Sequence, residues 1–269
     1  MKKTILTILC ICIMVMFSQK TFADLSTGLV GYYDFNGNAL DKSGNSNNAT
    51  VIGASLTTDR DGNADSAYSF DGINDYMRAA NATTLQVSDT MTMSAWVFME
   101  DQGRSRIAGV YQGDGDIEYA MMFDSKKMRM QTKNNNDQWG LNSTFSNTTI
   151  SGFAWHHLIF TFDKPTYKFY LDGQLDGSGS WNSSIMNNNA NPALYIGNQA
   201  NLYPNEYFEG KIDELRIYNR ALSEIEIEQL STGDLAGIAV APEPVSTTLF
   251  LAGAITLGFR QLRKKKIAA

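Results

Sequence analysis

An all-β fold, with two antiparallel sheets packed as a sandwich or jelly roll, is predicted by three features of this 269-residue chain. Short segments rich in aromatic and β-branched residues recur between turns of Gly, Asn and Asp. One such segment is followed directly by Asp172-Gly173, a dipeptide that favours the tight turn of a β-hairpin. The body has one helical pattern, which begins at Ser223 with a Ser223/Glu226 capping box and is predicted to end at about Leu230. The clearest predicted strands are 91–98, 156–162, 167–171, 194–196 and 212–218.

The amino end predicts a secretory signal peptide over residues 1–23, with a helical apolar centre. Two lysines precede the apolar run 5–17, and Thr21-Phe22-Ala23 supplies a cleavage site. Signal peptidase and the Sec translocon are therefore expected partners, and the mature chain is expected to begin at Asp24. Both cysteines lie inside the removed segment, so we expect neither a disulfide nor a thiolate metal site in the mature protein.

The carboxyl end has the features of a membrane-directed segment over residues 242–269. A Pro-Glu-Pro triplet is followed by an apolar run at 245–259, predicted to be helical, and then by a basic cluster. At ~1.5 Å per residue this helix reaches about 22 Å, whereas the hydrocarbon core of a bilayer is ~30 Å thick. This helix could span the membrane only if the bilayer became thinner locally or if the flanking Lys and Arg side chains reached outward to its surface. The basic cluster after the helix would leave the body on the outer side of the membrane. A buried amphipathic C-terminal helix is the alternative. The motif residues are Pro242, Glu243, Pro244, Arg260, Arg263, Lys264, Lys265 and Lys266.

This order of parts resembles the PEP-CTERM sorting signal of Gram-negative bacteria that make exopolysaccharide. The resemblance implies an exosortase-like processing enzyme as a partner. It also implies transient tethering to the inner membrane, followed by release to the cell surface or the extracellular matrix. The segment 232–241, rich in small residues, is predicted to link this tail to a body at 24–231.

The exported body is strongly acidic. The whole chain has a formal charge of -6, and the two terminal segments carry eight cations, so residues 24–244 carry -14. This charge argues against binding of nucleic acid or anionic lipid through a basic face. The negative charge is compatible with binding of divalent cations or neutral glycans, and it also favours solubility.

Blocks along the body resemble the LamG-like jelly-roll family of the concanavalin A-like lectin/glucanase superfamily, and they occur in the family's order. The resemblance covers roughly residues 25–230. It implies two face-to-face antiparallel sheets and, commonly, binding of glycans or other extracellular ligands. The blocks are 31–44, 66–72 with 75–76, 93–97, 155–158, 169–173, 195–197, 210–218 and 219–223.

No catalytic site is expected. Related glucanases carry Glu-x-Asp-x-x-Glu on one strand, which places two carboxyl groups at the ~5 Å separation used in retaining hydrolysis, and this string does not occur. Asp114, Asp116 and Glu118 form the nearest acidic cluster, but Gly115 favours a turn there. His156 and His157 are adjacent, so on a strand they point to opposite sides. With only these two histidines, a Ser-His hydrolase is poorly supported.

A structural Ca²⁺ is the expected cofactor, because loop carboxylates and carbonyls are the ligands this ion prefers. By resemblance to related sandwiches, Asp41 and Asp213 help to hold it, with Asn36 where the family often has an acid. The alternatives are an Asx-turn for Asp41 and a strand-end hydrogen bond for Asp213. The acidic segment 59–65 also looks like a calcium loop, but its glycine is misplaced for an EF-hand, and we interpret it as a polar turn.

Aromatic residues in polar loops are candidate platforms for sugar rings. Trp96 and Trp155 fall in strand blocks and are expected in the core. Trp139 and Trp181 lie among Asn, Gln, Gly and Ser, where exposure is expected. The alternative for any one candidate is packing against its own loop. Three further candidates in comparable loops are Tyr111, Tyr203 and Tyr207.

These features predict an exported, non-catalytic cell-surface or extracellular-matrix module that binds a polysaccharide or another extracellular ligand. A divergent glycoside hydrolase and a purely structural matrix protein are the alternatives.

Overall fold

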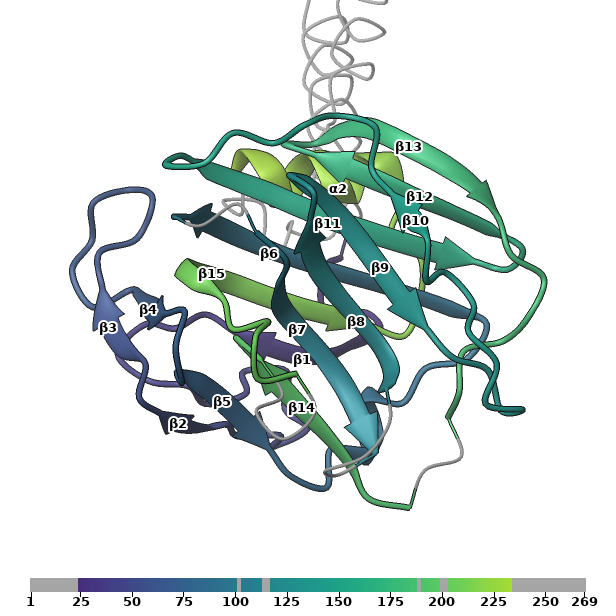
Figure 1. Ribbon diagram of the computed structural model, residues 1–269, viewed down its shortest axis with the longest axis horizontal. Helices are drawn as coiled ribbons and strands as arrows, with labels where there is room; N and C mark the ends of the chain where they lie inside the picture. Colours follow the sequence, from purple (N-terminus) through teal and green to yellow (C-terminus); the bar gives the residue numbers. More distant parts are fainter. Residues whose placement is uncertain (1–23, 101–102, 113–116, 188–189, 199–202, 234–269) are drawn as a thin grey trace, which may run out of the picture. The chain divides into compact units, whose positions relative to one another are not determined.

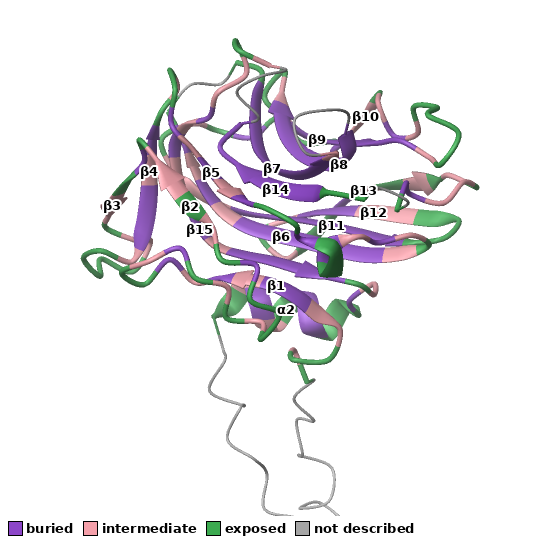
Figure 2. Ribbon diagram, turned by 90° about the horizontal axis from the view of Figure 1, so that it is seen from below, coloured by how far each residue is buried: buried purple, intermediate pink, exposed green. Residues whose placement is uncertain are grey.

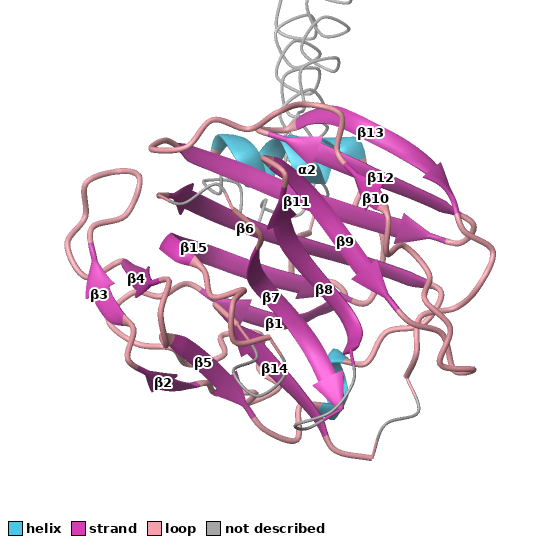
Figure 3. Ribbon diagram, viewed as in Figure 1, coloured by secondary structure: helices cyan, strands magenta, loops and turns pink. Residues whose placement is uncertain are grey.

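The computed structural model describes residues 24–100, 103–112, 117–187, 190–198 and 203–233. The predicted signal peptide, most of the linker and the sorting tail lie outside these ranges. The described residues form two antiparallel sheets packed face to face, with one short α-helix, which confirms the predicted fold class (Figures 1 and 3). Within these ranges no helix has the length and apolar character needed to cross a bilayer.

Sheet A is the larger sheet, with strands in the order β13-β12-β11-β6-β15-β4-β3. The ten-residue strand β15 pairs with β4 along its first half and with β1 along its second half. The strands are β1 (Leu29–Tyr33), β3 (Ser55–Thr57), β4 (Ala67–Asp71), β6 (Thr90–Met99), β11 (Trp155–Asp163), β12 (Thr166–Leu171), β13 (Gln174–Ser180) and β15 (Glu209–Tyr218).

Sheet B has the order β10-β9-β8-β7-β14-β5-β2. A short 3-10 helix, η1 (Thr83–Leu85), lies in the connection from sheet B back to β6 of sheet A. The strands are β2 (Thr50–Ile52), β5 (Tyr76–Ala79), β7 (Ser105–Gln112), β8 (Ile117–Asp124), β9 (Lys127–Thr132), β10 (Thr144–Phe145) and β14 (Pro192–Ile196).

The core fills the space between the two sheets and is rich in methionine and phenylalanine. Along β6, Met91, Met93 and Val97 alternate toward this core and are fully buried. Methionine side chains from β8 and β9 meet them from sheet B, and such unbranched side chains fill irregular gaps well. Figure 2 shows that the buried residues lie mainly in the strands of the two sheets, whereas exposed residues lie mainly in the loops.

Helix α2 (Glu224–Thr232) covers part of the outer face of sheet A. The predicted capping box is present: the Ser223 hydroxyl accepts from the Glu226 amide, and the Glu226 carboxylate accepts from the Ser223 amide. Ile227 and Leu230 pack on outward-facing side chains of β11, β12 and β15. The helix ends at Gly233, whose left-handed φ of 68° is typical of a helix C-cap. The predicted and observed ends differ by two residues.

Candidate ligand-binding rim

Trp139 is presented by a short, internally bonded loop that follows β9. Lys133 and Trp139 form an antiparallel bridge that closes the loop. Inside it, the Asn134 amide donates to the Gln138 carbonyl at 3.0 Å, and the Asn134 side-chain oxygen accepts from the Asn136 and Gln138 amides, each at 3.0 Å. The loop backbone is therefore held in one conformation, and Trp139 with it.

The Trp139 indole is 46% exposed, which is a large surface for a tryptophan in a folded protein. The Lys133 ammonium lies 4.8 Å from the ring centroid and 2.8 Å from an Asp137 carboxylate oxygen. The cation steadies the ring, and the carboxylate balances its charge. Trp139 is therefore an aromatic platform, and the Lys133–Asp137 pair beside it carries no net charge.

A second segment, just before β14, is tied to this loop. The Asn187 amide donates to the Asn135 side-chain oxygen at 3.0 Å, and the Met186 amide donates to the Lys133 carbonyl at 2.7 Å. The Asn135 and Asn187 side chains also contact each other, with nitrogen and oxygen 3.3 Å apart. We call residues 133–139 and 186–187 the Trp139 rim. Side-chain amides offer both donors and acceptors, which match the hydroxyl groups of a sugar.

Trp181, the other predicted platform, supports this rim from below. Its ring is half-buried and lies 5.5 Å from the ring of Phe162 in the core. A Cβ atom at Gly140 would lie 2.2 Å from the Trp181 ring, so only glycine fits where the rim loop crosses it. Trp181 is therefore a packing residue of the loop in addition to any contact it makes with a ligand.

Two of the three tyrosine candidates, Tyr111 and Tyr203, lie together, with ring centroids 6.5 Å apart. Tyr111 was expected in a polar loop, and this expectation is wrong: it is a residue of β7, is 1% exposed, and its hydroxyl accepts from Arg106 at 3.1 Å. Burial raises its pKa. Tyr203 is half-buried and lies over the same guanidinium, 3.4 Å from its carbon to the ring centroid. Tyr207 is also half-buried.

The expectation of a core position is wrong for Trp96 and Trp155. Trp96 alternates with the buried residues of β6, Trp155 pairs with Phe98 on the same side, and both tryptophans are half-buried on the outer side of sheet A. Trp96 stacks on His157 with centroids 4.8 Å apart and planes 2° apart. The Arg60 guanidinium lies on Trp96, 4.7 Å from the ring. The resemblance located the strands correctly, but it did not say which face of each strand the tryptophans occupy.

The carboxylates predicted for calcium are engaged by protein donors. Asp41 accepts from the backbone amides of Tyr32, Ser43 and Asn47 at 2.9 to 3.0 Å, which is the alternative turn-capping role. Asp213 is paired with Arg60 at 2.7 Å, and Asn36 lies in an exposed turn. Among the described residues no group of three or more acidic, His or Cys side chains has the arrangement of a metal site. As they stand, these side chains do not fit a Ca²⁺ ligand set.

The acidic cluster considered for catalysis is only partly described. Asp114 and Asp116 lie outside the described residues, while Glu118 is fully buried and accepts from the Gln86 amide group at 3.0 Å.

The two histidines point to opposite sides of β11, as expected. Burial and the charges of Arg216 and Arg60 lower the pKa of His157 well below its ordinary value. Its ring bonds to Ser94 and Ser231 at 2.7 and 2.9 Å. His156 instead contacts Ser151 and Asp172. The adjacency of the two histidines predicts only that they do not form a pair, and it carries no signal for the contacts of His156 with Ser151 and Asp172.

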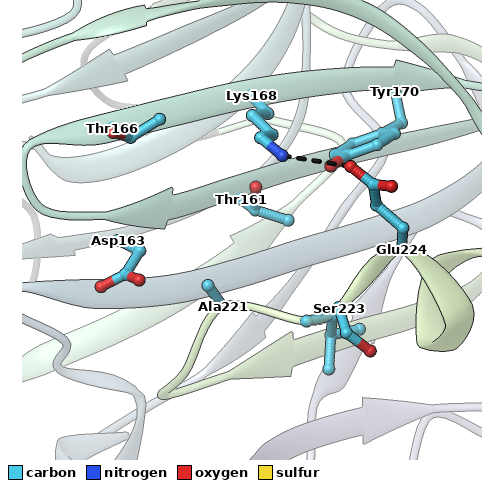
Figure 4. Close-up of a pocket in the computed structure, with 9 residues that line it drawn as sticks. Thr161, Asp163, Thr166, Lys168, Tyr170, Ala221, Ser223 and Glu224 are labelled. Carbon is cyan, nitrogen blue, oxygen red and sulfur yellow. Dashed lines mark hydrogen bonds and ion pairs between the residues drawn. The ribbon is translucent and has the colours of Figure 1, made fainter.

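A polar groove of about 220 Å³ lies on the outer face of sheet A, beside the start of α2 (Figure 4). Thr161 faces it from β11, and Lys168 and Tyr170 face it from β12. Lys168 is bonded to Glu224 of the helix at 3.3 Å, so the charges at this end of the groove are already paired. The groove is small, open and bordered by hydroxyl groups.

A family model described as the concanavalin A-like lectin/glucanases superfamily matches residues 71–228, more than half of the chain. The chain belongs to this superfamily. No curated protein matches the chain significantly.

Solved structures share the concanavalin A-like fold at low identity. Domain 4 of AbnA, a GH43 extracellular arabinanase from Geobacillus stearothermophilus solved with arabinotriose, is 21% identical, with a TM-score of 0.56 over 76% of this chain and 98% of that one. The binding domain of Paraclostridial Mosquitocidal Protein 1 is 19% identical, with a TM-score of 0.59 over 78% of this chain and 53% of that one. A mutant Trypanosoma rangeli sialidase is 18% identical, with a TM-score of 0.58 over 78% of this chain and 33% of that one. Glycosidases and binding domains therefore share this fold, and function has to be argued from the sites.

Proposed function

We propose that this chain is an exported module that binds neutral polysaccharide at the Trp139 rim. The observation that carries the proposal is an exposed indole held in one position by a closed loop and bordered by side-chain amides. Aromatic faces pack against the apolar faces of sugar rings, and amides bond to the hydroxyls around them. The arabinanase domain of similar fold, solved with arabinotriose, supports a glycan as the ligand class.

The charges around Trp139 favour a neutral glycan over an acidic one. Lys133, the cation at the ring, already bonds to Asp137. The whole body carries -14, so a polymer of uronic acids would be repelled at long range. The carboxylate in the rim is held in this ion pair, which suits binding rather than cleavage of a glycosidic bond.

Replacing Trp139 with alanine is expected to weaken polysaccharide binding by about 10- to 100-fold, the usual loss when a central aromatic contact is removed. Affinity electrophoresis of the full chain in gels containing neutral or acidic polysaccharides measures this loss. Ile73→Ala is the matched control, because Ile73 is 71% exposed and lies outside the rim; it should bind as the unmodified chain does. Unchanged retardation of the Trp139 variant, or no retardation of the unmodified chain by any envelope polysaccharide, would contradict the proposal.

The sorting half of the proposal rests on the termini, which lie outside the described residues. The signal peptide and the resemblance of residues 242–269 to a PEP-CTERM tail support export, transient tethering to the inner membrane and processing by an exosortase-like enzyme. Intact-mass spectrometry of the surface or matrix form is expected to show a chain that begins at Asp24 and lacks the basic cluster after residue 259. Recovery of a form that still carries residues 260–266 would rule out this processing.

A further inference from the structure

Ser151, His156 and Asp172 form a continuous hydrogen-bonded series at one end of the sandwich. The Ser151 hydroxyl oxygen lies 3.0 Å from His156 Nε2, and His156 Nδ1 lies 2.9 Å from Asp172 Oδ2. Ser151 belongs to the loop before β11, His156 is the second residue of β11, and Asp172 is in the turn between β12 and β13. Ser151 and His156 are therefore near neighbours in the sequence, and the pairing of β11 with β12 brings Asp172 back beside them.

The acid of this series is fixed by the backbone. The amide of Asp172 donates to the His157 carbonyl at 2.9 Å, and its Oδ1 accepts from the His157 amide at 2.8 Å. Its second oxygen is thereby directed at His156. Since a carboxylate only accepts, Nδ1 carries the proton, and Nε2 presents a lone pair to the Ser151 hydroxyl. This is the arrangement in which an imidazole acts as a general base toward a serine.

The serine is held on both sides and is open to solvent. The Ile150 amide donates to the Lys126 carbonyl, and the Phe153 amide donates to the Met99 carbonyl, each at 2.8 Å. These bonds pin the loop to both sheets. Ser151 is exposed, and the His156 and Asp172 side chains are 16% and 47% exposed, so a polymer can reach the hydroxyl without entering a deep cavity.

Groups that could assist acyl chemistry lie beside the serine. In the described part of the chain, the Gly152 amide donates no hydrogen bond to a protein acceptor, so it is available to a developing oxyanion. Phe153 is 69% exposed and offers an apolar surface to a small acyl group.

We propose that Ser151 is a nucleophile, activated by His156, that removes small acyl groups carried as esters on a polysaccharide. Ser151 Oγ attacks the ester carbonyl carbon and its proton passes to His156 Nε2. The ester C–O bond then breaks, and the departing sugar oxygen takes that proton. Water repeats the sequence on the acyl-serine, which releases a carboxylic acid and restores the hydroxyl. Asp172 is a positioning residue that holds the imidazole. This activity goes beyond the glycan binding proposed for the Trp139 rim.

Labelling of the full chain with a fluorophosphonate probe, together with hydrolysis of p-nitrophenyl acetate, tests the proposal without any glycan. One label on Ser151 is expected. Ser151→Ala should abolish labelling and His156→Gln should lower its rate by about 100-fold or more, since general-base assistance is typically worth 10²- to 10⁴-fold. Ser125→Ala, at an exposed serine of the β8–β9 turn, is the matched control and should label normally. Absence of labelling in the unmodified chain, or equal labelling of Ser151→Ala, would overturn the proposal.

Asp172→Asn separates positioning from a purely structural role. If Asp172 positions His156, labelling slows in a variant that remains folded at the assay temperature. If the carboxylate only fastens the β12–β13 turn, the variant unfolds at a lower temperature, while its folded fraction labels at the unmodified rate. The second result would remove Asp172 from the proposal and contradict the triad as stated.

Discussion

Replacing Phe160 with alanine is expected to lower the free energy of unfolding by about 3–5 kcal/mol, the usual cost of removing a buried ring. Phe160 lies in the middle of β11 and is fully buried. Its ring centroid lies 6.4 Å from that of Tyr167 and 5.3 Å from that of Phe169. Strands of two paired sheets close around this cluster, so the cavity left by the ring cannot collapse without moving backbone.

Urea unfolding followed by tryptophan fluorescence measures this change. Phe153→Ala removes the same side chain from a site that is 69% exposed, so its cost should stay within about 0.5 kcal/mol. Equal losses for the two variants would mean that Phe160 does not belong to the core as described.

Four strands of sheet A, β6, β11, β12 and β15, were predictable because their sequence signals are local. In β6, small and sulfur-containing residues alternate with outward-facing ones, and the Asp172-Gly173 turn has the positive φ angles that its hairpin type requires, 51° and 80°. The capping box of α2 is equally local. The alternation of β6 also predicts where Trp96 lies: its neighbours Ala95 and Val97 face the core, so Trp96 faces outward. The alternation, rather than the resemblance of the block to a family strand, places that ring on the outer face.

Sheet B was harder to predict for a physical reason. Strands β7 and β8 are buried along almost their whole length on both faces, so their hydrophobic pattern has no period of two.

Strand β13, at the edge of sheet A, was hard to predict for a different reason. It is poor in apolar residues, so its sequence looks like that of a loop.

The two candidate sites depend on contacts distant in the chain. The rim platform Trp139 could be proposed from its polar neighbours, but the packing of Trp181 against Gly140 joins segments 41 residues apart. Ser151 reaches His156 because its loop is pinned to Lys126 and Met99. Neither contact has a local sequence signal. The position of Asp172 was the one clue available: it directly follows β12, and antiparallel pairing brings the end of β12 back beside the start of β11.

Asp213 is expected to make the protein less stable as the pH rises from about 4 to about 8. Its carboxyl group is 1% exposed. Arg60 Nη1 bonds to one oxygen at 2.7 Å, while Oδ1 has no partner among the described residues. Burial, aided by the negative charge of Glu214 and opposed by Arg60, raises the pKa of Asp213 to about 7. The unfolded chain releases this proton near its ordinary value of 3.8. In the window between these values the folded state therefore binds more protons than the unfolded state, and the free energy of unfolding falls as the pH increases.

Asp213→Asn isolates this contribution, because asparagine keeps the shape of the side chain and does not ionise. Relative to the unmodified protein, the variant should gain about 2–4 kcal/mol in free energy of unfolding between pH 4.5 and pH 8.5, as measured by urea unfolding at both values. Asp61→Asn is the matched control: its side chain is 66% exposed and lies 3.7 Å from the same guanidinium. Its effect should be small, because an exposed ion pair contributes little to stability. A pH-independent effect of Asp213→Asn would mean that attraction to Arg60 outweighs burial and keeps Asp213 ionised throughout. Arg60 would then be the dominant influence on this carboxylate, and its position on Trp96 would serve chiefly to hold that ion pair in place.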